Sequence, residues 1–153
     1  METKIYKKTL TLIYLFLLVI CHAQCKRLNI LIMIDEKPCL TVNNFSINIP
    51  PSIKENVFKY IVGSIDVNDN FYLDLLNSSS QNININFGAI IPDKVFVSKY
   101  SISIPKIYLF EEYIIINIYN LDNKKYRHKY TKLVKDSKEY YVVIKTPNSM
   151  KFD

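Results

Sequence analysis

The feature that most constrains the fold is a series of short apolar segments of strand length, separated by clusters of turn residues. In residues 45–49, for example, Phe45, Ile47 and Ile49 alternate with Ser46 and Asn48, as in a half-buried strand. Short strands at this spacing predict an all-β fold, which we expect to be a two-sheet antiparallel β-sandwich. The predicted strands are residues 28–34, 45–49, 58–62, 71–76, 83–87, 95–104, 113–119, 126–134 and 140–145.

The first 23 residues have the three-part layout of a secretory signal peptide. Three lysines in the first eight residues precede an apolar run over residues 10–20, and the small Ala23 marks a cut before Gln24. The run is too short for a membrane span, which needs roughly 20 apolar residues. We therefore expect a secreted, extracellular protein with a single domain over residues 24–153 and no membrane span after cleavage. An uncleaved anchor and a lipid-anchored form are the alternatives.

Basic residues are concentrated near the C-terminal end. The formal net charge is +6, and it falls to near +4 once the leader is removed. Much of the remaining charge lies in a predicted hairpin over residues 124–138, which carries Lys124, Lys125, Arg127, Lys129 and Lys132. Such a stripe can attract polyanions, although secretion argues against nucleic acid. The alternative is a solvated strand pair whose lysines discourage edge-to-edge aggregation.

The two cysteines after the leader are Cys25 and Cys39. Secretion permits a disulfide between them. A turn over residues 35–38 would place Cys39 opposite Ile34, far along the hairpin from Cys25, and bridged Cα atoms must lie within about 7 Å. The sequence leaves open whether the two cysteines pair. So few ligands do not favour zinc.

No catalytic or metal-binding motif is complete. Residues 66–70 begin like a calcium loop, but Phe71 and Asn77 occupy the places that need Gly and Glu, so we expect a simple turn there. His128 would share a strand face with Tyr126 and Tyr130, and no nucleophile motif accompanies it. Adjacent carboxylates at residues 111–112 would point to opposite faces of a strand. These patterns predict a protein that is not an enzyme and has no metal or cofactor, with a small hydrolase as a remote alternative.

Two glycosylation sequons begin at Asn44 and Asn77, and they matter only in a eukaryotic source. Asn77 is the better acceptor, since it falls in a predicted turn.

An ordered set of segments in the middle of the chain is similar to the galectin domain. The segment PPSIKENVFKYIVG (50–63) is followed by FYLDL (71–75), a Ser/Asn turn, ININF (83–87) and KVFV (94–97). Galectins have a proline-led loop, a strand ending in Gly, an F-x-x-x-L strand, then L-H-F-N-P-R and V-V-x-N-S strands. The resemblance covers residues 47–100. It implies a jelly-roll, concanavalin-like sandwich that binds β-galactosides on glycans.

The galactoside motif itself is largely missing. Its H-x-N-x-R residues fall on Asn86, Gly88 and Ile90, and the chain has no Trp to stack on a sugar. The Asn of V-x-N falls near Lys99. Residues 108–111 offer a Y-x-x-E in place of W-x-x-E, unless residues 109–110 are instead the family's Pro-Phe. We therefore expect ordinary lactose binding to be undetectable.

The resemblance assigns a candidate groove and a function. The groove-lining residues would be Asn84, Asn86, Lys99, Tyr108 and Glu111. The predicted function is a secreted, galectin-like carbohydrate-binding module, or lectin, that binds a glycan or glycoprotein through a non-standard site. The alternative is a β-sandwich of another lineage, with an adhesion, structural or inhibitory role, that binds protein or polyanion through the basic hairpin.

Overall fold

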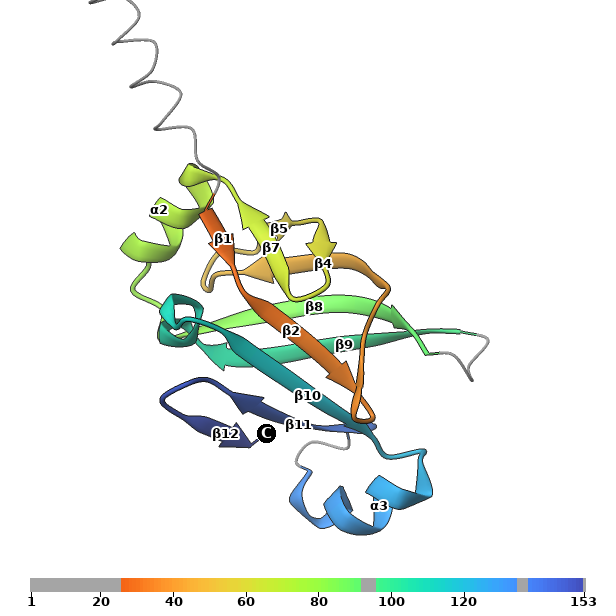
Figure 1. Cartoon of the computed structure of the whole chain (residues 1–153). Coiled ribbons are helices and arrows are strands. Elements are labelled where there is room, and N and C mark those ends of the chain that lie inside the picture. The colour runs from red at the N-terminus through yellow and green to blue at the C-terminus, as the bar shows by residue number, and fades with distance from the viewer. Residues whose placement is uncertain (1–25, 92–95, 135–137, 153) are drawn as a thin grey trace, which may run out of the picture.

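The computed structural model of the chain describes residues 26–91, 96–134 and 138–152 (Figure 1). The predicted signal peptide and Cys25 lie outside these ranges. Strands dominate the described residues, as the sequence predicts. They form three sheets, however, and not two.

Four of the strands form an antiparallel sheet. Its inner face carries Ile47, Ile85 and Ile102, which occupy adjacent strands at the same level and are fully buried. Strict alternation in the sequence explains this, because every second side chain of a strand points to the same face. The strands, in spatial order, are β5 (Glu55–Val57), β4 (Val42–Asn48), β8 (Asn82–Ile90) and β9 (Val97–Pro105).

A five-stranded sheet contains the one departure from antiparallel pairing among the described strands. Its central strand, β10, runs parallel to the neighbouring β2, with Ile114 opposite Ile30 and Ile118 opposite Ile34. The prediction of a purely antiparallel fold is therefore wrong. The strands, in spatial order, are β12 (Met150–Phe152), β11 (Tyr140–Lys145), β10 (Ile114–Asn120), β2 (Ile30–Ile34) and β3 (Lys37–Pro38).

A small third sheet arises because the first predicted strand is divided at Asn29. The Asn29 side chain is exposed and donates a hydrogen bond to the carbonyl of Glu112 at 2.8 Å. Residues before this point pair with a strand of the small sheet, and residues after it enter the five-stranded sheet. The strands of the small sheet are β1 (Lys26–Leu28), β7 (Ser64–Val67) and β6 (Tyr60–Ile61).

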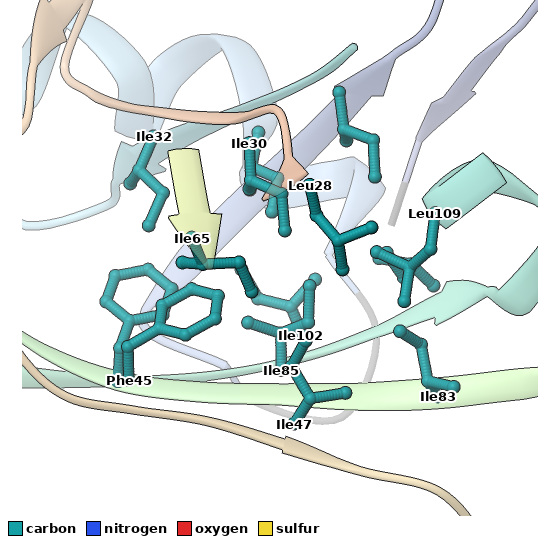
Figure 2. Close-up of a cluster of buried hydrophobic side chains, with 14 of the residues drawn as sticks. Leu28, Ile30, Ile32, Phe45, Ile47, Ile65, Ile83, Ile85, Ile102 and Leu109 are labelled. Atoms are coloured by element: carbon teal, nitrogen blue, oxygen red, sulfur yellow. The ribbon is translucent and has the colours of Figure 1, made fainter. Parts of the chain in front are cut away.

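A single hydrophobic core joins the three sheets. Figure 2 shows Phe45, Ile47, Ile83 and Ile85 of the four-stranded sheet pointing toward side chains from β1, β2 and β7. Those facing side chains include Leu28, Ile30, Ile32 and Ile65, all buried. Burial of a large aliphatic side chain contributes about 1.5–3 kcal/mol, so this shared core is the main source of stability.

Two segments predicted as strands are helices. Helix α2 (Asp69–Asn77) buries Phe71 and Leu75, and Asn68 caps it by accepting a hydrogen bond from the Phe71 amide at 2.8 Å. The calcium-like segment is therefore the entry to a helix and not a turn between strands. Helix α3 (Lys124–Tyr130) and a 3-10 turn, η2 (Thr131–Leu133), replace the predicted basic hairpin. No helix in the described ranges combines the length and apolar composition that a membrane crossing requires.

The first hairpin is tighter than predicted. Only Asp35 and Glu36 form its turn, both with positive φ (51° and 68°), as a type I′ turn requires. The pairing of Ile34 with Lys37 places Cys39 beside Ile32, whose carbonyl accepts from the Cys39 amide at 2.9 Å. The predicted position of Cys39 opposite Ile34 is therefore wrong.

Candidate functional site

The outer face of the four-stranded sheet is polar over its middle section, whereas Ile90 and Val97 make it apolar at one end. On β8, Asn84 and Asn86 alternate with buried Ile83, Ile85 and Phe87. The neighbouring strand β9 adds two serines to the same face, because Ser103 lies opposite Asn84 and Ser101 opposite Asn86. Ser101 Oγ donates to Asn86 Oδ1 at 2.7 Å. These amides and hydroxyls both donate and accept hydrogen bonds, so the face suits a polar, uncharged ligand.

Strand β4 continues this polar face on the other side of β8. Asn48 lies opposite Asn84, and Ser46 lies opposite Asn86. The Asn48 Oδ1 atom is buried and accepts no hydrogen bond from the residues that the structure describes. A buried polar atom without a partner is costly, and because this oxygen has almost no exposed surface, no ligand can reach it unless neighbouring groups move. We call Asn48, Asn84, Asn86, Ser101 and Ser103 the polar face; Ser46 shares their side of the sheet but is only 2% exposed.

A pocket of about 820 Å³ borders the polar face at the start of β9. One wall is β9 and the other comes from the end of β10 and the start of β11; Lys99 lies both on the outer face of β9 and in this pocket. The lining consists of residues 96–100, 120–122 and 138–140, together with Arg127.

A buried hydrogen-bond network holds the two walls together. Tyr100 Oη donates to Asn120 Oδ1 at 2.9 Å, and the Asn120 amide groups donate to the two carboxylate oxygens of Asp35 at 2.9 and 3.2 Å. Burial raises the pKa of Tyr100 to about 12, so its hydroxyl keeps its proton at neutral pH. The Tyr140 ring packs edge-on against Tyr100, with centroids 5.1 Å apart.

Charged groups line the pocket with both signs. Lys99, Arg127 and Lys138 are the cations, and Asp122 and Glu139 are the carboxylates. The Arg127 guanidinium donates to the Leu121 carbonyl at 2.7 Å.

Three of the five predicted groove residues share one face. Asn84, Asn86 and Lys99 all lie on the outer side of β8 and β9. Tyr108 belongs to the 3-10 turn η1 (Lys106–Phe110), is partly buried and packs against the core. Glu111 accepts a hydrogen bond from Asn148 Nδ2 at 2.6 Å, in the connection between β11 and β12. The structure therefore groups Asn84, Asn86 and Lys99, and ties Tyr108 and Glu111 to other parts of the fold.

The basic segment is helical and part of its charge is already engaged. Lys125 Nζ lies 2.6 Å from Glu36 Oε2 in the first hairpin turn. This contact lowers the pKa of Glu36 and raises the pKa of Lys125. Lys129 Nζ lies 4.9 Å from the centroid of the Tyr130 ring. Lys124, Lys129 and Lys132 are exposed.

The remaining sequence candidates are dispersed. His128 is exposed on α3, so it does not share a strand face with Tyr126 and Tyr130. Cys39 is a buried free thiol, and its proposed disulfide partner lies outside the described residues. No three His, Cys, Asp or Glu side chains come together as a metal site in residues 26–91, 96–134 and 138–152.

The two sequon asparagines also differ from expectation in their surroundings. Asn44 lies in β4 with a positive φ of 51°, within an irregularity of the pairing between β4 and β8. Asn77 is the last residue of α2 and not part of a turn. Asn44 and Asn77 are both exposed.

Sequence reasoning missed Asn48, Ser101 and Ser103 as neighbours of Asn84 and Asn86. A signal was present, because Ser46-Ile47-Asn48 and Ser101-Ile102-Ser103 repeat the polar–Ile–polar pattern of β8. Only the register between strands brings the three patterns together. Searches for a matching protein-family model, curated protein or solved structure found none.

Proposed function

We propose that the protein is a secreted, non-enzymatic, galectin-like carbohydrate-binding module that recognises a glycan on its polar face. The observation that carries the proposal is the set of Asn and Ser side chains on β4, β8 and β9, at matched positions over a largely apolar inner face. Sugar hydroxyls both donate and accept hydrogen bonds, and so do these side chains. On the outer side of the four described strands the register places two charged residues, Glu55 opposite Asn48 and Lys99 opposite Gly88.

The galectin-like sandwich is part of the proposal. Two sheets with a shared apolar core, one of them polar on its outer side, agree with such a fold. The parallel pair β10–β2 and the small third sheet are departures from the family pattern. Loss of the family's sugar-binding residues means that the ligand is a glycan other than a simple galactoside.

Asn86 occupies the centre of the polar face. Its Oδ1 accepts from Ser101, and its Nδ2 has no protein acceptor among the described residues, so Nδ2 is free to donate to a ligand. Asn84, two residues away on the same face of β8, is a second partly exposed amide. Two such amides can engage neighbouring hydroxyls of a glycan.

A glycan array tests the proposal. We would express the full chain, purify the folded product and screen it beside Asn86→Ala and Asn84→Ala. Each lost hydrogen bond should weaken binding about fivefold or more. Asn70→Ala is the matched control, since Asn70 is exposed on α2. Absence of glycan binding by the folded protein, or equal binding by all variants, would refute the proposal.

A second candidate function is binding of a polyanion or a protein through the basic segment, with the protein belonging to a lineage other than the galectins. The observation that favours it is the exposure of Lys124, Lys129 and Lys132 on α3 and η2. Retention on heparin should fall when Lys129 and Lys132 are both changed to Glu. Unchanged retention would exclude this version.

A further inference from the structure

Strand β9 has a free edge that is blocked at one residue only, among the residues that the structure describes. It is the last strand of the four-stranded sheet. The Tyr140 hydroxyl bonds to both backbone groups of Ser101, accepting from its amide at 3.0 Å and donating to its carbonyl at 2.8 Å. In an antiparallel strand the amide and carbonyl of one residue point to the same side, and residues two apart share that side. The backbone groups of Lys99 and Val97 therefore point to the same free edge as those of Ser101.

The part of this edge that precedes Ser101 runs along the pocket. No residue in the described ranges forms a hydrogen bond to the edge between Val97 and Lys99. The pocket of about 820 Å³ lies beside it, with Leu121 and Tyr140 on the opposite wall. This volume is within the range of ordinary ligand sites. At the rim, Phe96 is 81% exposed and Val97 is 48% exposed, so apolar side chains flank unpaired backbone groups.

We propose that the start of β9 binds an extended, acidic segment of another polypeptide as an added strand. Unpaired amides and carbonyls that alternate along a strand are complementary to a second extended backbone. The pocket would take every second side chain of that segment, and Phe96 and Val97 would contact apolar ones. This site is separate from the glycan site proposed above, because it uses the edge of the sheet and not its face.

Of the charged groups along this pocket, which include two carboxylates, Lys99 is the one that lies on the edge strand itself, and it favours an acidic side chain in the partner. Lys99 lies on the outer side of β9, is exposed and has no described ion-pair partner. A carboxylate directly opposite Lys99 would be a favourable cross-strand pair. Pairing with β9 of a second copy centred on Lys99 would place two lysines opposite each other, and a lysine on an edge strand generally prevents such pairing. A different, acidic strand is therefore favoured over self-association.

Fluorescence anisotropy with designed peptides tests the proposal on the ligand side. The probe is a fluorescein-labelled peptide with three Val-Glu repeats. Controls are the same peptide with N-methylated glutamates, which cannot donate backbone hydrogen bonds, and a Val-Lys version. We expect saturable binding of the first peptide. Both controls should bind at least fivefold more weakly, since each lost hydrogen bond weakens binding by a factor of about five. No saturable binding, or equal binding of the N-methylated peptide, would overturn the proposal.

Variants of the protein test the same edge without relying on one substitution. Lys99→Pro removes a backbone amide on the free edge that makes no hydrogen bond to β8. Lys99→Ala keeps this amide and is the control. The proline variant should therefore bind the peptide about fivefold more weakly than the alanine variant. Tyr140→Phe releases the Ser101 backbone groups and lengthens the free edge, so it should bind the peptide more tightly. Weaker or unchanged binding by Tyr140→Phe would contradict strand addition. Dimerisation that Lys99→Pro abolishes would assign the edge to a second copy instead.

Discussion

The most informative substitution for the fold is Tyr100→Phe, because it removes one hydroxyl and changes little else. That hydroxyl is buried and donates to Asn120 Oδ1 at 2.9 Å; Tyr100 and Asn120 are only 3% and 5% exposed. The substitution loses this hydrogen bond and leaves the Asn120 oxygen with an unpaired acceptor position. From the usual cost of such a loss, the free energy of unfolding should fall by about 1–2 kcal/mol.

The measurement is urea unfolding followed by circular dichroism, since the chain has no Trp to report by fluorescence. Tyr113→Phe is the control, because Tyr113 is 42% exposed and the same atom is removed from its side chain. Its free energy of unfolding should stay within about 0.5 kcal/mol of the native value. Equal effects of the two substitutions would refute the reasoning, since burial of the Tyr100–Asn120 bond would then have no energetic consequence.

Alkaline pH provides a second signature of the same hydroxyl. Burial raises the pKa of Tyr100 to about 12, compared with about 10 in an unfolded chain. Between these values the unfolded chain has released a proton that the folded protein still holds. The stabilisation from this group is thus fully present below a pH of about 10 and is lost as the pH rises toward 12. Tyr100→Phe lacks this loss, so its stability should approach that of the native protein across the same window.

Three further predictions concern other parts of the fold. Asn68→Ala removes the cap of α2 and should lower the free energy of unfolding by about 1 kcal/mol, whereas Asn68→Asp should be nearly neutral; an Asn68→Ala variant with the urea midpoint of the native protein would contradict the cap. Ile85→Ala removes a fully buried side chain and should cost about 2–5 kcal/mol in the same assay, far more than Ile53→Ala at an exposed position. In a Cys25→Ser background, burial raises the pKa of Cys39, so its thiol should react with Ellman's reagent only after unfolding; rapid labelling of the folded protein would show that Cys39 is accessible.

Strict alternation of polar and apolar residues made the strands of the four-stranded sheet predictable. The helices were not predictable, because their buried residues have a spacing that fits a strand as well as a helix. In β8 the polar and apolar residues alternate from Asn82 to Phe87, a pattern that a helix cannot place on two faces. In α2 and α3 the decisive pairs are Phe71 with Leu75 and Tyr126 with Tyr130, each four residues apart. Residues four apart lie on one side of a strand and on one side of a helix. Local aromatic content then favoured strands, while the caps at Asn68 and Asn123 favoured helices.

The candidate site was predictable only where it depends on one strand. Asn84 and Asn86 share a face because they are two residues apart, whatever the rest of the chain does. The grouping of Tyr108 and Glu111 with them depended on the path of the chain after β9. There a 3-10 turn buries Leu109 and directs Glu111 toward Asn148 instead. The parallel pairing of β2 and β10 likewise has no local sequence signal.

That parallel pair has a consequence for how the chain reaches its native state. Residues 30–34 must find partners at residues 114–118, more than eighty positions later, and those partners form the central strand of the five-stranded sheet. Closing a loop of this length precedes any gain from the contacts, so topology of this kind folds slowly. During synthesis the apolar strand β2 emerges long before its partner exists. Until then its sequence, ILIMI, is an exposed, aggregation-prone segment. The following strand of the same chain, β3, covers one edge of β2, and its Lys37 and Pro38 discourage further strand pairing.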